Sequence, residues 1–309
     1  MSATPSVEPS TPGAEGSAPA AATCPKPEVR GFFDARTWTW TYVVYDAATK
    51  DAVIIDPVLD FDPASGRTWT ESADAVVRLV EALGLRVHLQ LETHAHADHL
   101  SGSQPLKAML GAGVAIGADI TAVQRVFAPV FNLGPDFALD GSQFDRLIHD
   151  GDALQLGSLQ IQAISTPGHT PACMSLRIGD AVFTGDALFL PDIGVGRCDF
   201  PAGSAEALYA SVHGKLYSLP ASTRVFVGHD YPPAGRGAQS ETTIGESKAH
   251  NVHLREGSSK DEFVAFRTSR DKGLAAPRLL LPSIQVNIDA GRLPAAESNG
   301  TSYIKIPLR

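Results

Sequence analysis

The sequence is poor in cysteine, with only Cys24, Cys173 and Cys198 among its 309 residues. So sparse and odd a number argues against a disulfide framework and fits a reducing compartment. The first 24 residues also lack the basic and apolar regions of a secretory signal and the arginines of a transit peptide. We therefore expect a cytoplasmic protein.

Positive charge is also scarce, because 25 Lys and Arg residues face 34 Asp and Glu residues, for a net charge of −9. A nucleic-acid groove needs clustered Lys and Arg, so this class of partner is not expected. No apolar run approaches the roughly 20 residues that a membrane span requires. We therefore expect neither a nucleic acid nor a membrane as a partner.

Residues 1–24 are mostly Pro, Ala, Ser and Thr, a composition that predicts a disordered tail. The rest of the chain alternates strand and helix patterns, which indicates an α/β layered architecture. Ser72 can cap a helix over residues 72–83 that Gly84 ends, and a second amphipathic helix is expected over residues 204–219. Aromatic and β-branched runs predict strands over residues 28–34, 39–46, 51–58, 86–93, 159–166, 173–180, 181–186 and 223–230.

The segment "ETHAHADHL" at residues 92–100 places three histidines and an aspartate in one short loop after a predicted strand. Imidazole and carboxylate are ligands that borderline divalent metals prefer, and a solvated polar loop would not need so many of them. Polar residues at later strand ends complete the candidate metal set, which is His94, His96, Asp98, His99, His169, Asp186 and His229. The remaining histidines lack ligand spacing and are expected at the surface or in the core: His88, His149, His213, His250 and His253.

This order of motifs resembles the metallo-β-lactamase superfamily from about residue 29 onward. The resemblance implies an α/β (α+β) fold, an αββα four-layer sandwich with a metal site at one edge. It implies a catalytic core over residues 25–235 and an extension over 236–309, which we expect to pack on the core and close the mouth of the substrate site. In members with two metals, His94, His96 and His169 would hold one ion. Asp98, His99 and His229 would hold the other, with Asp186 bridging.

Two segments, "GVGRCDF" at 194–200 and "GHDY" at 228–231, resemble those of persulfide dioxygenases, although Cys198 stands where Thr is usual. The resemblance implies oxidation of glutathione persulfide by O₂ to sulfite and glutathione. It implies one Fe(II) held by His94, His169 and Asp186. Residues expected to assist catalysis are Asp98, His99 and Asp230. Residues expected to contact the substrate are Arg197, Tyr231, Asn251 and Arg255.

Glyoxalase II enzymes resemble the chain as well, so a thioester hydrolase with two zinc or mixed metal ions is the alternative function. Such enzymes usually carry Glu where Asp230 stands. A third alternative is a metal-binding or sensor protein without catalysis, which a complete ligand set disfavours. A homodimer is compatible with any of these functions.

Overall fold

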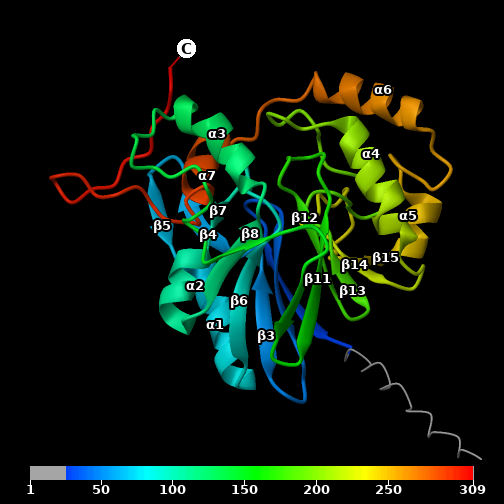
Figure 1. The fold of residues 1–309 in the computed structure, drawn as a ribbon, viewed down its shortest axis with the longest axis horizontal. Helices are drawn as coiled ribbons and strands as arrows, with labels where there is room; N and C mark the ends of the chain where they lie inside the picture. Colours follow the sequence, from blue (N-terminus) through cyan, green and yellow to red (C-terminus); the bar gives the residue numbers. More distant parts are fainter. Residues whose placement is uncertain (1–25, 309) are drawn as a thin grey trace, which may run out of the picture.

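The computed structural model describes residues 26–308 (Figure 1), so the tail predicted over residues 1–24 lies outside the described part of the chain. Two six-stranded sheets and a small three-stranded sheet form the framework. The first large sheet has the order β1 (Glu28–Asp34), β2 (Thr39–Tyr45), β3 (Asp51–Ile55), β6 (Arg86–Glu92), β8 (Gly113–Gly117) and β9 (Arg146–Ile148). Its first three strands are antiparallel, whereas β3, β6, β8 and β9 run parallel.

The second large sheet is antiparallel except where β13 runs parallel to β14. Its strand order is β10 (Ala153–Leu156), β11 (Leu159–Ser165), β12 (Met174–Ile178), β13 (Ala181–Phe183), β14 (Arg224–Phe226) and β15 (Glu241–Thr243). The small sheet has the order β5 (Arg67–Trp69), β4 (Val58–Asp62) and β7 (Leu100–Ser101).

The central core lies between the two large sheets. Alternating side chains of both sheets meet there, and all are buried: Val44, Val53, Leu91, Ile161, Leu176 and Phe183. The alternation seen in the sequence therefore directs one face of each sheet toward the other.

Helices cover the outer faces of both sheets (Figure 1). Apolar residues of α1 (Glu71–Leu83) and α2 (Ser103–Leu110) pack on the first sheet, as do those of α3 (Ile120–Val130) and α7 (Leu280–Asn287) around β8. Those of α4 (Ala205–Gly214), η1 (Leu216–Ser218), α5 (Ile244–His250) and α6 (Lys260–Asp271) cluster with the outer face of the second sheet. The expected four-layer αββα arrangement is thus confirmed.

The predicted strands are present, but the helix boundaries and number differ from the expectation. The prediction that Ser72 caps a helix is wrong, because α1 begins at Glu71 and the Ser72 hydroxyl donates to Asp60 Oδ1 at 2.8 Å. Gly84 does end α1 in a left-handed conformation with φ of 63°. The second predicted helix stops at Gly214 instead of continuing to residue 219, and α2, α3, α5, α6 and α7 were not predicted.

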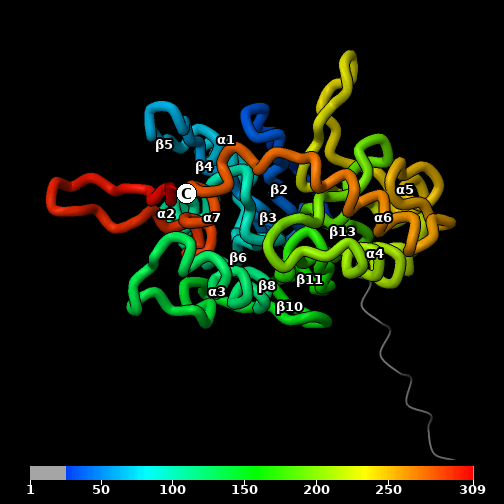
Figure 2. The backbone as a smooth tube through the Cα atoms, turned by 90° about the horizontal axis from the view of Figure 1, so that it is seen from above, coloured from blue at the N-terminus to red at the C-terminus, as the bar shows by residue number. Residues whose placement is uncertain are grey.

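The segment between α6 and α7 crosses from the side of the second sheet to the side of the first (Figure 2). It passes over the end of the sandwich at which α3 and α7 lie (Figure 1). Within residues 26–308, no helix has both the length and the apolar character that a membrane crossing demands.

Candidate functional site

Loops that follow strands bring the predicted metal residues together at one edge of the sandwich. They follow β6, β11, β13 and β14, and they carry His94, His96, Asp98, His99, His169, Asp186 and His229. Strand ends are fixed by the sheet ladders, so side chains on short loops there are held in defined positions.

His94, His169 and Asp186 form a compact group. One ligand atom from each lies within 4.8 Å of the others. His169 Nε2 is 3.5 Å from Asp186 Oδ2, and all three residues are buried. Two imidazoles and one carboxylate at this spacing could hold one metal ion and leave coordination positions open.

A second group lies beside the first. The ligand atoms of His96, Asp98 and His99 also lie within 4.8 Å of one another. His229 Nε2 is 3.3 Å from Asp98 Oδ2 and 3.3 Å from Asp186 Oδ1. Asp186 therefore faces both groups, and the geometry accommodates either one ion or two.

Hydrogen bonds on the outer side of the rings orient the histidines. His99, His169 and His229 each donate from Nδ1 to a backbone carbonyl, at 3.1, 2.7 and 3.2 Å. Several inward atoms are buried without a hydrogen-bond partner: Nε2 of His94, His99 and His229, Nδ1 of His96 and Oδ1 of Asp186. A buried polar atom without a partner lowers the stability of the folded protein. A bound cation would give these nitrogen and oxygen atoms a partner. The residues present therefore fit a metal ion.

His96 is held in a different way from the other histidines. Its Nε2 lies 3.0 Å from Asp56 Oδ1 and 3.5 Å from Glu92 Oε2. Asp56 also accepts from the Thr93 amide at 2.7 Å, and Glu92 accepts from the Ser103 hydroxyl at 2.6 Å. The two carboxylates thus have hydrogen-bond partners and orient His96, a role that the sequence analysis did not assign to them.

Asn287 on α7 fastens the loop that carries the first four candidates. Its Nδ2 donates to the carbonyls of His96 and His99, both at 2.8 Å, and its Oδ1 accepts from the Ser101 amide at 2.8 Å. The side chain is buried, so these bonds are shielded from water. No pattern in the sequence singles out Asn287, because its partners lie far away in the chain.

Burial sets the protonation of several histidines. Burial, together with the neighbouring imidazoles, lowers the pKa of His94 well below its ordinary value. The same causes lower the pKa of His99. For His229, burial also acts downward, but the charges of Asp98 and Asp186 outweigh it and raise the pKa. His94 and His99 are therefore neutral near pH 7, which is the form of imidazole that binds a metal.

A cavity of 530 Å³ opens beside the metal candidates. Asp98, His169 and Asp186 belong to its lining, and this volume is within the usual range for small-molecule sites. Aromatic rings of Trp38, Phe189 and Tyr231 give apolar surface. Another part of the lining comes from residues after the second sheet and is here termed the C-terminal wall: Arg267, Arg270, Leu274, Pro277, Arg278 and Leu279.

Arg197 and Tyr231, two predicted substrate residues, line this cavity. Arg197 is already paired, because Nε and Nη2 donate to the Asp199 carboxylate at 2.5 and 2.6 Å. Gly196, the residue before it, donates its amide to the Asp186 carbonyl. A Cβ on Gly196 would lie 2.2 Å from that carbonyl oxygen, so the loop can cross Asp186 only with glycine there.

The other predicted residues lie elsewhere. Asn251 is fully buried and donates from Nδ2 to the Gly194 carbonyl at 3.0 Å. Arg255 belongs to the lining of a separate hollow around residues 248–258. Asp230, which was expected to assist catalysis, accepts hydrogen bonds from Arg236 at 2.6 and 2.8 Å. None of these three lines the 530 Å³ cavity.

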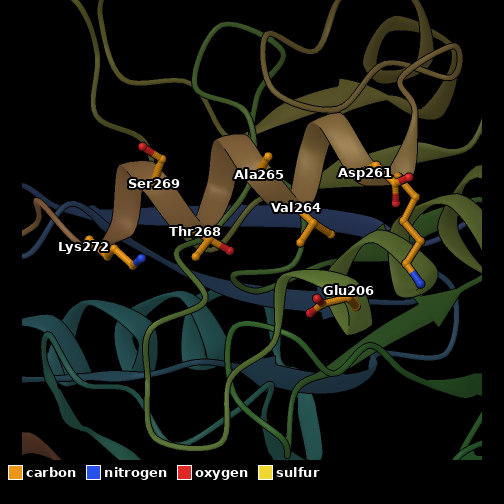
Figure 3. A pocket seen from close by; sticks show the side chains of 8 residues that line it. Glu206, Asp261, Val264, Ala265, Thr268, Ser269 and Lys272 are labelled. Atoms are coloured by element: carbon orange, nitrogen blue, oxygen red, sulfur yellow. The ribbon is translucent and has the colours of Figure 1, made fainter.

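A further hollow of 580 Å³ lies between α4 and α6 (Figure 3). Glu206 of α4 faces it from one side, and Asp261 and Thr268 of α6 and Lys272, directly after α6, from the other. It contains none of the metal candidates, and its charges have both signs. The cavity beside His169 and Asp186 is therefore the candidate substrate site.

The sequence model of the Metallo-beta-lactamase superfamily matches residues 39–229, which is more than half of the chain. This span includes every loop that supplies a metal candidate. The chain belongs to the metallo-β-lactamase superfamily.

Similar proteins within this superfamily indicate which kind of protein the chain is. The protein named "Probable metallo-hydrolase" of Burkholderia pseudomallei is 52% identical over 290 residues, which are 91% of this chain and 98% of that protein. "Persulfide dioxygenase ETHE1, mitochondrial" of Bos taurus is 37% identical over 238 residues, 76% of this chain and 78% of that protein. The crystal structure of ETHE1 from Myxococcus xanthus matches with a TM-score of 0.68 and 34% identity, over 86% of this chain and 100% of that one. Together with the ligand clusters, these similarities indicate a metal-dependent enzyme.

Proposed function

We propose that the protein is a persulfide dioxygenase that converts glutathione persulfide and O₂ to sulfite and glutathione. The observation that carries the proposal is the group of His94, His169 and Asp186, whose ligand atoms lie within 4.8 Å of one another. Two histidines and one carboxylate are typical of non-haem Fe(II) oxygenases. Similarity to persulfide dioxygenases, at 37% and 34% identity, supports the same reaction.

When bound by these three residues, Fe(II) supplies the redox chemistry that lets O₂ react with sulfur. In the overall reaction, the outer sulfur of the persulfide is oxidised and O₂ is reduced. Water supplies the third oxygen of sulfite, the sulfur–sulfur bond breaks, and glutathione leaves as the thiol. The cytoplasmic location stays a prediction.

Side chains of the cavity have separate tasks in this proposal. Trp38, Phe189 and Tyr231 keep bulk water away from the reacting sulfur. Asp98 lines the cavity, and its carboxylate, on a side chain that is 26% exposed, is placed to accept a proton that is released as sulfite forms. His99 and His229, which lie beside Asp98, hold it in position.

A thioester hydrolase is the second candidate. The specific observation in its favour is the second group of His96, Asp98 and His99, with His229 beside it, which could hold another ion. The 52% identical relative is named a probable metallo-hydrolase, which supports the same reading. In this alternative, the two residue groups would hold two ions, which would supply the activation of water needed to hydrolyse a glutathione thioester.

Oxygen uptake distinguishes the two functions. Fe(II)-loaded protein is given glutathione persulfide while O₂ and sulfite are measured, and zinc-loaded protein is given a hydroxyacylglutathione. We expect O₂ uptake with matching sulfite, and its loss in His169→Ala. His250→Ala is the matched control, because the His250 side chain is 68% exposed and outside the site. Fast thioester hydrolysis without O₂ uptake would instead establish the hydrolase.

A further inference from the structure

The 530 Å³ cavity contains an excess of arginine for a chain that carries a net charge of −9. Its arginines are Arg36, Arg197, Arg267, Arg270 and Arg278, whereas its only carboxylates are the metal candidates Asp98 and Asp186. A concentration of cations in a cavity attracts an anionic ligand.

Three of these arginines have carboxylate partners inside the protein. Arg36 pairs with Asp34 and Asp60, and Arg197 pairs with Asp199. Arg267 is buried and pairs with Asp271. Their charges are therefore largely matched before any ligand arrives.

Arg270 and Arg278 differ from the other three. Both are exposed, and across residues 26–308 neither has a carboxylate within ion-pair distance. Both line the cavity that reaches His169 and Asp186. Two guanidinium groups that have no carboxylate partner in the described part of the chain, on the wall of a cavity, are suited to bind carboxylates from a ligand.

The helix that carries Arg270 is fixed to the site. Arg267, one turn earlier on α6, donates from Nη1 to the Val195 carbonyl at 3.2 Å. Its partner Asp271 accepts from the Cys198 amide at 2.7 Å. The backbone at Arg270 is thus held against the loop that crosses Asp186, and its long side chain remains free to adapt to a ligand.

We propose that Arg270 and Arg278 form a carboxylate subsite that binds the anionic end of the substrate. The identity of the substrate as a glutathione persulfide rests on the proposed function. Glutathione carries two carboxylates, so it can engage both guanidinium groups while its persulfide sulfur is at the metal. Because Arg197 already forms an ion pair with Asp199, it contributes less to substrate binding than its position in the Gly-Arg segment suggests.

The test measures binding and turnover separately. S-methylglutathione is titrated into zinc-loaded protein by calorimetry, which needs no turnover. Fe(II)-loaded protein is assayed by O₂ uptake with glutathione persulfide and with cysteamine persulfide, which has no carboxylate. The variants are Arg270→Gln, Arg278→Gln and the double variant. Arg125→Gln is the matched control, because Arg125 is an exposed arginine of α3 outside the cavity lining.

For the double variant we expect S-methylglutathione to bind roughly 10- to 100-fold more weakly, with a smaller effect of added salt than in the wild type. We expect KM for glutathione persulfide to rise by a similar factor, with kcat within about twofold and cysteamine persulfide unaffected. Unchanged binding and KM in the double variant would overturn the subsite, even if the dioxygenase reaction is observed.

Other outcomes distinguish a failure of the proposed dioxygenase function from a failure of the proposed subsite. If the wild type consumes no O₂ with either persulfide, yet binds S-methylglutathione and loses this affinity in the double variant, the dioxygenase fails and the subsite stands. If the wild type neither consumes O₂ nor binds S-methylglutathione, both proposals fail. Equal losses with glutathione persulfide and cysteamine persulfide would show a structural effect and overturn the subsite.

Discussion

His94, His99 and His229 are at most 1% exposed, whereas Arg270 and Arg278 of the C-terminal wall face solvent. The histidines are held by backbone carbonyls and neighbouring side chains, and their rings cannot turn without breaking buried bonds. Arg270 and Arg278 have long side chains that form no ion pair within residues 26–308. The side of the cavity that the seven metal candidates form, here termed the metal side, is therefore rigid before a ligand binds. Arg270 and Arg278 can adapt their side chains to the ligand.

The rigid metal side and the adaptable C-terminal wall come from different parts of the chain. The metal side comes from strand ends within residues 39–229, the span that the superfamily model matches. The C-terminal wall comes from residues 267–279, beyond that span. We infer that the shared part of the fold provides the chemistry and that the later segment selects the substrate, as expected when function depends on sites added to a common fold.

The largest effect is expected on the metal side. Asp186→Ala removes the carboxylate that faces both histidine groups, so the protein should lose bound metal and at least roughly 1000-fold in kcat, about 4 kcal/mol of transition-state stabilisation. Metal analysis and O₂ uptake check this. Asp261→Asn, at an exposed residue of α6 that does not line the 530 Å³ cavity, should retain both. A normal metal content in Asp186→Ala would contradict the assigned role of the metal side.

The next effect concerns the ion pair that joins the wall to the site. Asp271→Asn leaves Arg267 buried without its anion and weakens the acceptor for the Cys198 amide. We expect a loss of about 3 kcal/mol in the free energy of unfolding, measured by urea denaturation. Asp261→Asn, on the same helix but exposed, serves as the control again. Stability equal to the control would mean that the wall is not fastened through this pair.

Asn287 tests how far the rigidity of the metal side depends on α7. Asn287→Ala leaves two buried carbonyls and one buried amide without their partner, so we expect a loss of about 2 kcal/mol in stability. Metal affinity should also fall, by roughly 10-fold, because the loop is less well held. Asn299→Ala, at an exposed asparagine, should change neither quantity. Stability loss with unaltered metal affinity would limit Asn287 to folding.

The effect that is smallest near pH 7 is a pH dependence at His253, which lines the cavity although the sequence analysis assigned it no role. Burial, with the charges of Arg267 and Arg270, lowers the pKa of His253 to about 4. Between about pH 6.5 and 4 the unfolded chain therefore binds a proton that the folded chain does not, so stability falls as the pH falls. His253→Gln should flatten this part of the stability curve. Parallel curves for variant and wild type would refute the assignment.

The metal side could be predicted from the sequence because its signals are local. The alternation in residues 86–93 and 159–166 marks strands, and the histidines follow directly in the chain. Asp56 and Glu92 could not be recognised, because their role depends on which face of His96 they meet.

The C-terminal wall could not be predicted for a physical reason. Helix α6 has a polar sequence, KDEFVAFRTSRD, and it buries Arg267 along with Phe263, so no apolar stripe reveals it. The approach of Arg270 and Arg278 to the cavity depends on the tertiary course of the segment that joins α6 to α7. The sequence instead directed attention to Asn251 and Arg255, which do not line the cavity.

The bonds from Asn287 to His96 and His99 join residues 191 and 188 positions apart. During synthesis the histidine loop is made roughly 10 to 40 s before Asn287, at typical rates of translation. Throughout that interval the loop lacks the side chain that later fastens it. We therefore expect the loop to reach its full metal affinity only when the chain is nearly complete, because Asn287 fastens it.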